Sequence, residues 1–473
     1  MPQTDVVLIH APVDFNVGSP VGDQTSSPPI GLLYIAANLE KNNISVKIYD
    51  PVPERLNLET IMERLGNDMP KVVGISAVTF GAKTAVEIAK GIKEKFGKKI
   101  VVGLGGMHVS TDPDFIKRYP YFDFGIIGEG EIEMVKIVKR ILSGKSVKGL
   151  FKAELIKNLD DLPFPALHLI DLKNYFFPHG GMRGKLPLTM ISSRGCPFSC
   201  TFCSKPINRG NYRVRSGKNI VDEMEKFHGL CDGSYSFVCD TMTLFRNKTI
   251  EICDEIKKRG LKVKWMANTR VDRVDEELIR RMAEAGCTDL FFGIESGNDR
   301  IRNQVIKKNI TDEQIEKAAK WCWKYGIQSS AYMMLGFPTE TKKEIEDTIN
   351  YPIFAGVDFI GVHITWPQPG SVLYNEAIKE GIISKTVVDD FVKGKYGNSL
   401  SDFWPVYIPK GLTYQDLANA RKRAYRKFYL RPSWFIRRLI WYLRTPDKFL
   451  SDWGEVKIGI HALLSGTTGV AET

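Results

Sequence analysis

The sequence predicts an α/β protein: a Rossmann-like, doubly wound parallel sheet, then a partial (βα)6 barrel, then a mainly helical C-terminal region. Short apolar runs alternate with helical patterns from residue 5 to 142 and again from 188 to 364, as is typical of βαβ units. With 473 residues, 43% of them hydrophobic, the chain is long enough for about three domains. We expect the sheet domain at 1–145, a linker at 146–186, the barrel at 187–375 and a C-terminal domain at 376–473.

Five apolar runs predict the strands of the first sheet. They are DVVLI from residue 5, SVKIY from 45, VVGIS from 72, KIVVG from 99 and DFGII from 123. Helical patterns near 29–41, 58–66, 82–95, 113 and from 131 separate or follow them. The segment 158–187 is rich in Pro, Gly and aromatic residues, which suits a linker along the surface.

Six further runs predict the barrel strands: LTMIS from 188, YSFVC from 235, KVKWMAN from 262, TDLFFGI from 288, SSAYMML from 329 and DFIGVHI from 358. Six βα units are too few for a closed eight-stranded barrel, so we expect an open one. Beyond about residue 375 the strand pattern ends and a helical tail follows.

Composition narrows the location and the partners. The sequence lacks a leader-like apolar segment at its start and any run of about 18 apolar residues, and its cysteines do not form a secreted disulfide framework. We expect a cytoplasmic protein. Of the net charge of +11, the segment 421–444 carries nine Lys or Arg and no acid, leaving 11 − 9 = +2 elsewhere. We therefore expect no nucleic-acid partner.

Three cysteines, Cys196, Cys200 and Cys203, lie within eight residues in SSRGCPFSCTFCS. A structural zinc site needs four protein ligands, and His179 and His228 lie well outside the cluster without a pairing pattern. A disulfide would leave one thiol over. A cubane iron–sulfur cluster held by three thiolates would leave one iron open to a non-protein ligand.

The spacing CxxxCxxC, with Phe202 before the last cysteine and a position after the first barrel strand, resembles the radical S-adenosylmethionine superfamily. The resemblance implies a [4Fe-4S] cluster whose open iron chelates S-adenosylmethionine, and a reductant such as flavodoxin or ferredoxin. One-electron reduction then releases a 5′-deoxyadenosyl radical that abstracts hydrogen from an unactivated C–H bond.

The ends of later barrel strands are similar to the same superfamily, in FVCDTMTLF, ANTRVDRVD, FFGIESGNDRI and MMLGFPTET. Each segment alone is more often a turn, and their joint order carries the resemblance. The contacts with S-adenosylmethionine that it implies come from Asp240, Arg270, Glu295, Ser296, Met334 and Gly336.

The first domain carries GLGGMH at 103–108, which departs from a nicotinamide-binding GxGxxG because it follows the fourth strand and ends in His108. Together with PPIGLLYIAANLE, GISAVTF and GIIGEGE it resembles the cobalamin-binding domain that precedes the barrel in one subgroup of these enzymes. The implied cobalamin contacts are Pro29, Gly31, Ser76, Val78, Thr79, Gly105, Gly106, His108, Gly128, Glu129 and Gly130.

Two departures qualify the cobalamin site. The DxHxxG motif is absent, and His10 lies at the first strand end without that spacing, so we expect no histidine from that motif on the lower face of cobalt. We expect the loop around Val78 and Thr79 to cover that face. The alternative is a sheet domain that binds nothing and only covers the barrel. No cysteine precedes Cys196, unlike in the methylthiotransferases that act on tRNA, whose sheet domain holds a second cluster.

The segment 421–449 interleaves basic with aromatic residues, and its FYLRP is similar to relatives acting on lipids and tetrapyrroles. One interpretation is a positively charged surface for acidic headgroups or a carboxylated substrate, with the protein in contact with a membrane. The other is a helix pair that packs Phe428, Trp434, Leu439 and Tyr442 on the barrel and leaves the arginines solvated.

By the resemblance, the function is methylation of an unactivated carbon, with the methyl group passing through methylcobalamin to a substrate radical. A radical oxidative cyclase acting on a tetrapyrrole or lipid would use the same residues. A non-catalytic cobalamin-binding or redox-sensing protein is the third hypothesis, against which the intact cysteine triad argues. The substrate class stays open among small molecules, lipids and peptides.

Overall fold

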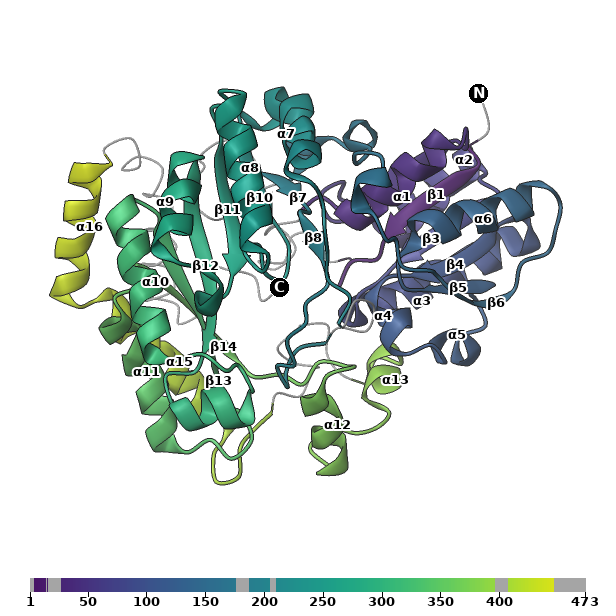
Figure 1. The fold of residues 1–473 in the computed structure, drawn as a ribbon. Coiled ribbons are helices and arrows are strands. Elements are labelled where there is room, and N and C mark those ends of the chain that lie inside the picture. Colours follow the sequence, from purple (N-terminus) through teal and green to yellow (C-terminus); the bar gives the residue numbers. More distant parts are fainter. Residues whose placement is uncertain are drawn as a thin grey trace.

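The computed structural model describes residues 4–13, 15, 27–175, 187–204, 210–395 and 407–445. Two six-stranded parallel sheets lie side by side, one in the N-terminal domain and one in the barrel (Figure 1). The predicted candidate ligand His179 and the end of the tail from residue 446 lie outside the described residues.

The N-terminal sheet has the order β2-β1-β3-β4-β5-β6. This order places a topological switch point between β1 and β3, where open parallel sheets bind ligands. The helices α1 and α6 cover one face, and α2 and α3 cover the other. The strands are β1 (Val6–His10), β2 (Val46–Tyr49), β3 (Val72–Ser76), β4 (Val101–Gly105), β5 (Phe124–Ile127) and β6 (Gly149–Lys152), and the helices are α1 (Ile30–Lys41), α2 (Leu58–Asp68), α3 (Ala82–Phe96) and α6 (Gly130–Leu142).

The doubly wound sheet is confirmed, but the expected number of five strands was wrong. The sixth strand, β6, pairs parallel with β5 and lies in the segment that we assigned to the linker. It is a half-exposed edge strand of four residues, GLFK, so it lacks the apolar run by which the inner strands are recognised.

The barrel sheet has the order β14-β13-β12-β11-β10-β7 and is open, because β7 and β14 are opposite edges. The predicted partial barrel is confirmed. Its helices pack on one face of the sheet and bury side chains such as Met333 of β13. The strands are β7 (Leu188–Met190), β10 (Ser234–Phe237), β11 (Lys264–Thr269), β12 (Cys287–Glu295), β13 (Gln328–Leu335) and β14 (Phe359–Ile364), and the helices are α7 (Gly217–Cys231), α8 (Arg246–Lys258), α9 (Glu276–Glu284), α10 (Asp312–Tyr325) and α11 (Lys342–Ala355).

A short antiparallel hairpin, β8 (Ser193–Arg194) and β9 (Arg213–Val214), follows the first barrel strand. The cysteine loop lies between its two strands. The hairpin therefore fixes both ends of that loop.

The C-terminal region divides into two parts. The helices α12 (Val372–Lys379) and α13 (Val387–Val392) join the apolar core of the N-terminal domain. The helix α15 (Tyr414–Tyr429) packs on the barrel, where the backbone N–H of Val362 donates a 2.8 Å hydrogen bond to the Tyr425 hydroxyl. The helix α16 (Pro432–Arg444) stands at the outer edge of the barrel, away from the N-terminal sheet (Figure 1). No helix among the described residues is both long and apolar enough to cross a membrane.

Candidate functional site

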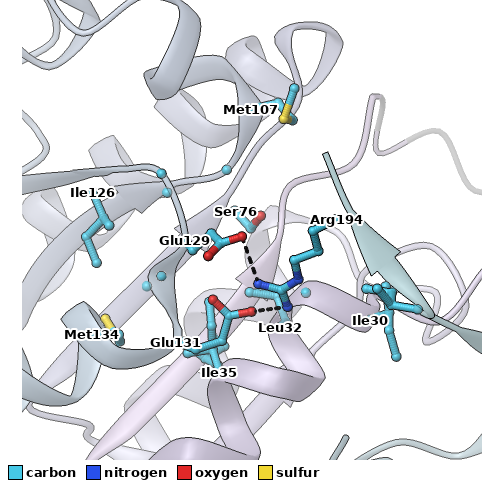
Figure 2. A pocket seen from close by; sticks show the side chains of 18 of the residues that line it. Ile30, Leu32, Ile35, Ser76, Met107, Ile126, Glu129, Glu131, Met134 and Arg194 are labelled. Carbon is cyan, nitrogen blue, oxygen red and sulfur yellow. Dashed lines mark hydrogen bonds and ion pairs between the residues drawn. The ribbon is translucent and has the colours of Figure 1, made fainter. Parts of the chain in front are cut away.

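A cavity of about 380 Å³ lies between the N-terminal sheet and the barrel. The N-terminal domain lines it at the carboxyl ends of β3, β4 and β5 and at the starts of α1 and α6, and the barrel lines it with residues 193–195 and 238–240 (Figure 2). The predicted site residues that line it are Gly31, Ser76, Gly105, Gly106, Gly128, Glu129, Gly130 and Asp240.

Glycines widen the N-terminal wall of this cavity. A Cβ at Gly31 would meet no atom within 4 Å, and one at Gly105 would meet only the Ile75 carbonyl oxygen at 3.9 Å, so a side chain at either would project into open space. Gly106 adopts φ +93°, and its Cβ would lie 2.8 Å from the Ala77 carbonyl oxygen, so only glycine fits there. With the apolar side chains of Ile126 and Met134 in the same wall, these residues fit a flat, bulky ligand such as cobalamin.

Four of the predicted cobalamin contacts do not line the cavity: Pro29, Val78, Thr79 and His108. The ring of His108 is buried and packs edge-on against Phe115 at 4.3 Å, with Nδ1 3.4 Å from the Thr79 hydroxyl. Burial lowers the pKa of His108 to about 4, so the ring is neutral at pH 7. His10 lies at the end of β1 with Nδ1 3.2 Å from an Asp50 carboxylate oxygen.

A buried charged seam joins the two domains at the cavity. We define it by four residues: Glu129 and Glu131 of the N-terminal domain, and Arg194 and Arg213 of the β8–β9 hairpin. Arg194 lies between the two carboxylates, 3.3 Å from Glu129 and 2.5 Å from Glu131 (Figure 2). Arg213 binds Glu129 through two 2.8 Å hydrogen bonds. All four side chains are at most 12% exposed.

The predicted cofactor-binding residue Glu129 is part of this seam. Its carboxylate also accepts a 3.0 Å hydrogen bond from the backbone N–H of Ile156. Burial raises the pKa of Glu129, but the hydrogen bond from Arg213 and the positive charge of Arg194 outweigh burial, so the net pKa is lowered. The carboxylate is therefore ionised and serves to tie the domains together.

A second buried contact lies behind the seam. Arg215 pairs with Glu223 at 2.6 Å and donates a 3.2 Å hydrogen bond to the hydroxyl of Tyr34, which belongs to α1 of the N-terminal domain. These ion pairs were not predicted from sequence. Two arginines flanking the cysteine loop, Arg194 and Arg213, were the only local signal for them.

The cysteine loop is anchored to the barrel. The Thr201 N–H and hydroxyl donate 3.0 Å hydrogen bonds to the carbonyl oxygens of Ile306 and Val305. Cys196 is buried, Cys200 and Cys203 are half-buried, and none of the three forms a disulfide. Across the described residues, no three Cys, His, Asp or Glu side chains converge on a point where one metal ion could sit. In a cubane cluster each thiolate binds a different iron, so three soft donors spread along one loop fit a cluster better than zinc.

The predicted barrel residues surround this loop. The Arg270 guanidinium stacks 3.7 Å from the ring centre of Phe198 and donates 2.8 and 2.7 Å hydrogen bonds to Asp272 and to the Lys308 carbonyl oxygen. Lys308 in turn pairs with Glu295 at 2.8 Å. Glu295 ends β12 with φ +69°, a strained conformation of the kind found at functional sites.

The other side of the loop contacts the end of β13. The ring of Phe202 lies edge-on to Phe337 at 6.0 Å, in an apolar group that includes Met334. Gly336 adopts φ +94°, and its N–H donates a 2.6 Å hydrogen bond to Glu340, a residue that sequence reasoning did not single out. Burial raises the pKa of Glu340 to about 7.

The predicted site residue Ser296 points into the interior of the barrel domain. Its side chain is buried, and its hydroxyl lies 3.0 Å from that of Thr348 on α11. The hydroxyl also accepts a 3.2 Å hydrogen bond from the Asn298 N–H. Its hydrogen bonds therefore hold the turn after β12.

Comparison with known proteins agrees with this arrangement. The model of the radical SAM superfamily matches residues 190–351, and that of the B12 binding domain matches residues 24–138. The chain is 30% identical over 463 residues to an uncharacterized methyltransferase of Pyrococcus horikoshii, covering 91% of this chain and 94% of the relative. It is 29% identical over 436 residues to the anaerobic magnesium-protoporphyrin IX monomethyl ester cyclase of Cereibacter sphaeroides, covering 87% of this chain and 68% of that relative.

Two solved structures share the fold. The methyltransferase TsrM of Kitasatospora setae, with cobalamin and a [4Fe-4S] cluster bound, aligns with a TM-score of 0.63 at 18% identity, over 80% of this chain and 75% of its own. The cobalamin-dependent radical enzyme OxsB aligns with a TM-score of 0.67 at 16% identity, over 99% of this chain and 78% of its own.

These matches define a radical S-adenosylmethionine enzyme with a B12-binding domain. The chain belongs to this family, together with the Pyrococcus horikoshii relative, and its cofactors are a [4Fe-4S] cluster, S-adenosylmethionine and cobalamin. The predicted family, enzyme class and cofactors are confirmed.

Proposed function

We propose that this enzyme is a C-methyltransferase that transfers a methyl group to an unactivated carbon of a small molecule. The observation that carries the proposal is the cavity between the two domains. It extends from the glycine edge of the N-terminal sheet, formed by Gly105 and Gly106, to Gly195, the residue before Cys196. With cobalamin against the glycine wall and the cluster on the barrel side, a substrate bound between them would face both cofactors. The Pyrococcus horikoshii relative and the 26% identical cytidylyl-2-hydroxyethylphosphonate methyltransferase of Streptomyces wedmorensis are both named methyltransferases.

The roles of the residues follow from their positions. When bound, the cluster and S-adenosylmethionine supply a radical that abstracts hydrogen, and cobalamin supplies the methyl group. Cys196, Cys200 and Cys203 hold the cluster. The backbone at Gly105 and Gly106 allows cobalamin to approach the ends of the strands.

Asp240, Glu295 and Met334, at the ends of β10, β12 and β13, would hold S-adenosylmethionine beside the cysteine loop, with Gly336 supplying backbone. Because Arg270 already binds Asp272 and stacks on Phe198, it holds the loop in place and offers its remaining hydrogen-bonding capacity to a carboxylate. The charged seam closes the cavity on one side and limits the entry of water.

Two parts of the reaction come from outside the chain. The enzyme takes a small-molecule substrate, and the alternatives that the cavity leaves are a lipid or a peptide side chain. We propose flavodoxin or ferredoxin as the electron donor for the cluster.

The test uses protein purified and assayed without oxygen, with dithionite as reductant and S-adenosylmethionine labelled in its methyl group. A small-molecule extract of the source cells serves as the substrate pool. We expect 5′-deoxyadenosine and S-adenosylhomocysteine together, with the label in an extracted compound that gains one carbon. Formation of 5′-deoxyadenosine with no labelled product in the complete extract would contradict the proposal.

An oxidative cyclase is the second candidate, because the cyclase of Cereibacter sphaeroides is 29% identical over 87% of this chain. The same assay separates the two. A cyclase product loses hydrogen and gains no label, and S-adenosylhomocysteine does not accumulate.

A further inference from the structure

The outermost helix, α16, exposes a row of large apolar side chains and buries an arginine between two tryptophans. Its buried residues Trp434, Arg438 and Trp441 are spaced i, i+4, i+7 and face the protein. The opposite side consists of large apolar side chains: Phe435 at 55%, Ile436 at 59%, Leu439 at 61%, Ile440 at 44% and Leu443 at 75% exposed. We call these five residues the α16 stripe.

The stripe overturns part of one sequence interpretation. The interpretation of a packed helix pair is right for Phe428 and Trp434, which are buried, but Leu439 is exposed and Arg438 is buried. Because apolar residues occur on all sides of this helix, its periodicity alone does not identify the inner side.

Specific contacts fix the orientation of α16. The Trp434 indole N–H donates a 3.1 Å hydrogen bond to the Asp358 carbonyl oxygen, and Arg437 binds the Asp358 carboxylate at 2.9 Å. The ring of Trp441 packs on Trp323 with centroids 5.4 Å apart. Rotating the helix about its axis to bury the stripe would break these contacts, so they hold the stripe on the outside of the protein.

Positive charge borders the stripe. The exposed side of α15 carries Lys422, Arg426 and Lys427, together with Arg423, which pairs with Glu346 of α11. Leu430, which is 55% exposed, lies in the turn between the two helices. The segment 421–444 contains nine Lys or Arg and no acidic residue. Apolar and cationic groups are therefore presented together, at the edge of the molecule opposite the N-terminal sheet (Figure 1).

We propose that the α16 stripe and the basic side of α15 dock on an anionic lipid bilayer, with α16 lying along the surface. A helix with exposed Phe, Leu and Ile and neighbouring Lys and Arg fits the boundary between headgroups and acyl chains. Each basic residue near such a surface adds electrostatic attraction. A second copy of this chain fits less well, because pairing through α16 would bring the exposed Lys422, Arg426 and Lys427 of both copies toward one another.

The test is co-sedimentation of the anaerobically purified holoenzyme with vesicles. One set contains equal parts of phosphatidylglycerol and phosphatidylcholine, and the other contains phosphatidylcholine alone. We expect binding to the anionic vesicles at 0.1 M NaCl, at least tenfold weaker binding to the neutral ones, and loss of binding as salt increases.

Variants separate the stripe from the charge. Leu439→Ser with Leu443→Ser should weaken binding to anionic vesicles at least tenfold. Leu142→Ser with Leu230→Ser is the matched control, since these leucines are 43% and 51% exposed on other helices, and it should bind like the parent. Changing Lys422, Arg426 and Lys427 to Gln should weaken binding and reduce its dependence on salt.

Three outcomes would overturn the proposal: a parent protein that does not bind anionic vesicles, stripe variants that bind as the parent does, and a lipid-free dimer that Leu439→Ser converts to a monomer. Iron and cobalt contents equal to the parent's establish that each variant is folded. Because these measurements do not involve turnover, they are independent of the methyltransferase proposal.

Discussion

The two sheets that border the cavity build their sides of it from different parts of the chain. The N-terminal sheet offers backbone, since glycines at the ends of its strands leave room for a ligand. The barrel sheet offers side chains: thiols on a loop, and charged residues such as Arg270 and Glu295 at the strand ends. A large cofactor that brings its own chemistry requires space from the protein, whereas a cluster and its co-substrate require ligands. A substitution on one side should therefore remove the cofactor of that side and leave the other cofactor bound.

The largest expected effect is at the barrel side. Cys200→Ala removes one thiolate of the cluster, so we expect loss of iron and of 5′-deoxyadenosine formation while cobalt content stays near one per chain. Metal analysis after anaerobic purification measures both. Cys253→Ala, which removes a buried thiol of α8, is the control and should keep its iron. Loss of both metals in Cys200→Ala would show that the two sides are not independent.

The converse change is Gly31→Leu on the N-terminal side. The new side chain meets no protein atom at its Cβ and fills the cavity, so we expect at least tenfold weaker cobalamin binding with normal iron content. Gly229→Leu is the matched control, because Gly229 also lies in a helix with no atom within 4 Å of a Cβ. Titration of the apoprotein with hydroxocobalamin, followed by absorbance, gives the affinities. Equal affinity in Gly31→Leu would remove this wall from the cobalamin site.

The seam between the sheets can be compared with an exposed contact. Arg194→Gln leaves Glu131 buried without its partner, and we expect a loss of about 3–5 kcal/mol in the free energy of unfolding. Arg118→Gln breaks two more exposed ion pairs, with Asp112 and Asp389, each worth about 0.2–1 kcal/mol. Urea unfolding measures both. Adding Glu131→Gln to Arg194→Gln should restore part of the loss, and simple additivity would argue against their coupling.

The smallest effect concerns His108. Since burial lowers its pKa to about 4 from 6.5, the unfolded chain binds more protons between these pH values, and stability falls as pH falls through this window. At pH 5 the loss relative to pH 8 is about 2 kcal/mol from this group. Urea midpoints of the parent and of His108→Gln at both pH values test this, with His168→Gln at an exposed position as the control. An equal dependence of stability on pH in the parent and in His108→Gln would contradict the assignment.

The comparison also shows what could be predicted from the sequence. Eleven strands, the cysteine loop and the glycine edge follow from local patterns, because apolar periodicity and motif spacing are properties of neighbouring residues. The seam does not, since Glu129 and Arg194 meet only after two domains have packed. The prediction for Glu129 missed these ion pairs but placed the residue at the cavity, which it lines, whereas His108 packs on Phe115 and does not line it. The domain boundaries and the ligand roles of the site residues stay predictions.

The charged seam has a consequence for building chimeras from members of this family. Glu129 and Glu131 belong to one domain, while Arg194 and Arg213 belong to the hairpin that carries the cysteine loop. If the N-terminal domain were exchanged for that of a relative with other residues at these positions, Arg194 and Arg213 would lose their ion-pair partners next to the cluster loop. The four residues thus act as one unit in this structure, and a working exchange must transfer them as a set.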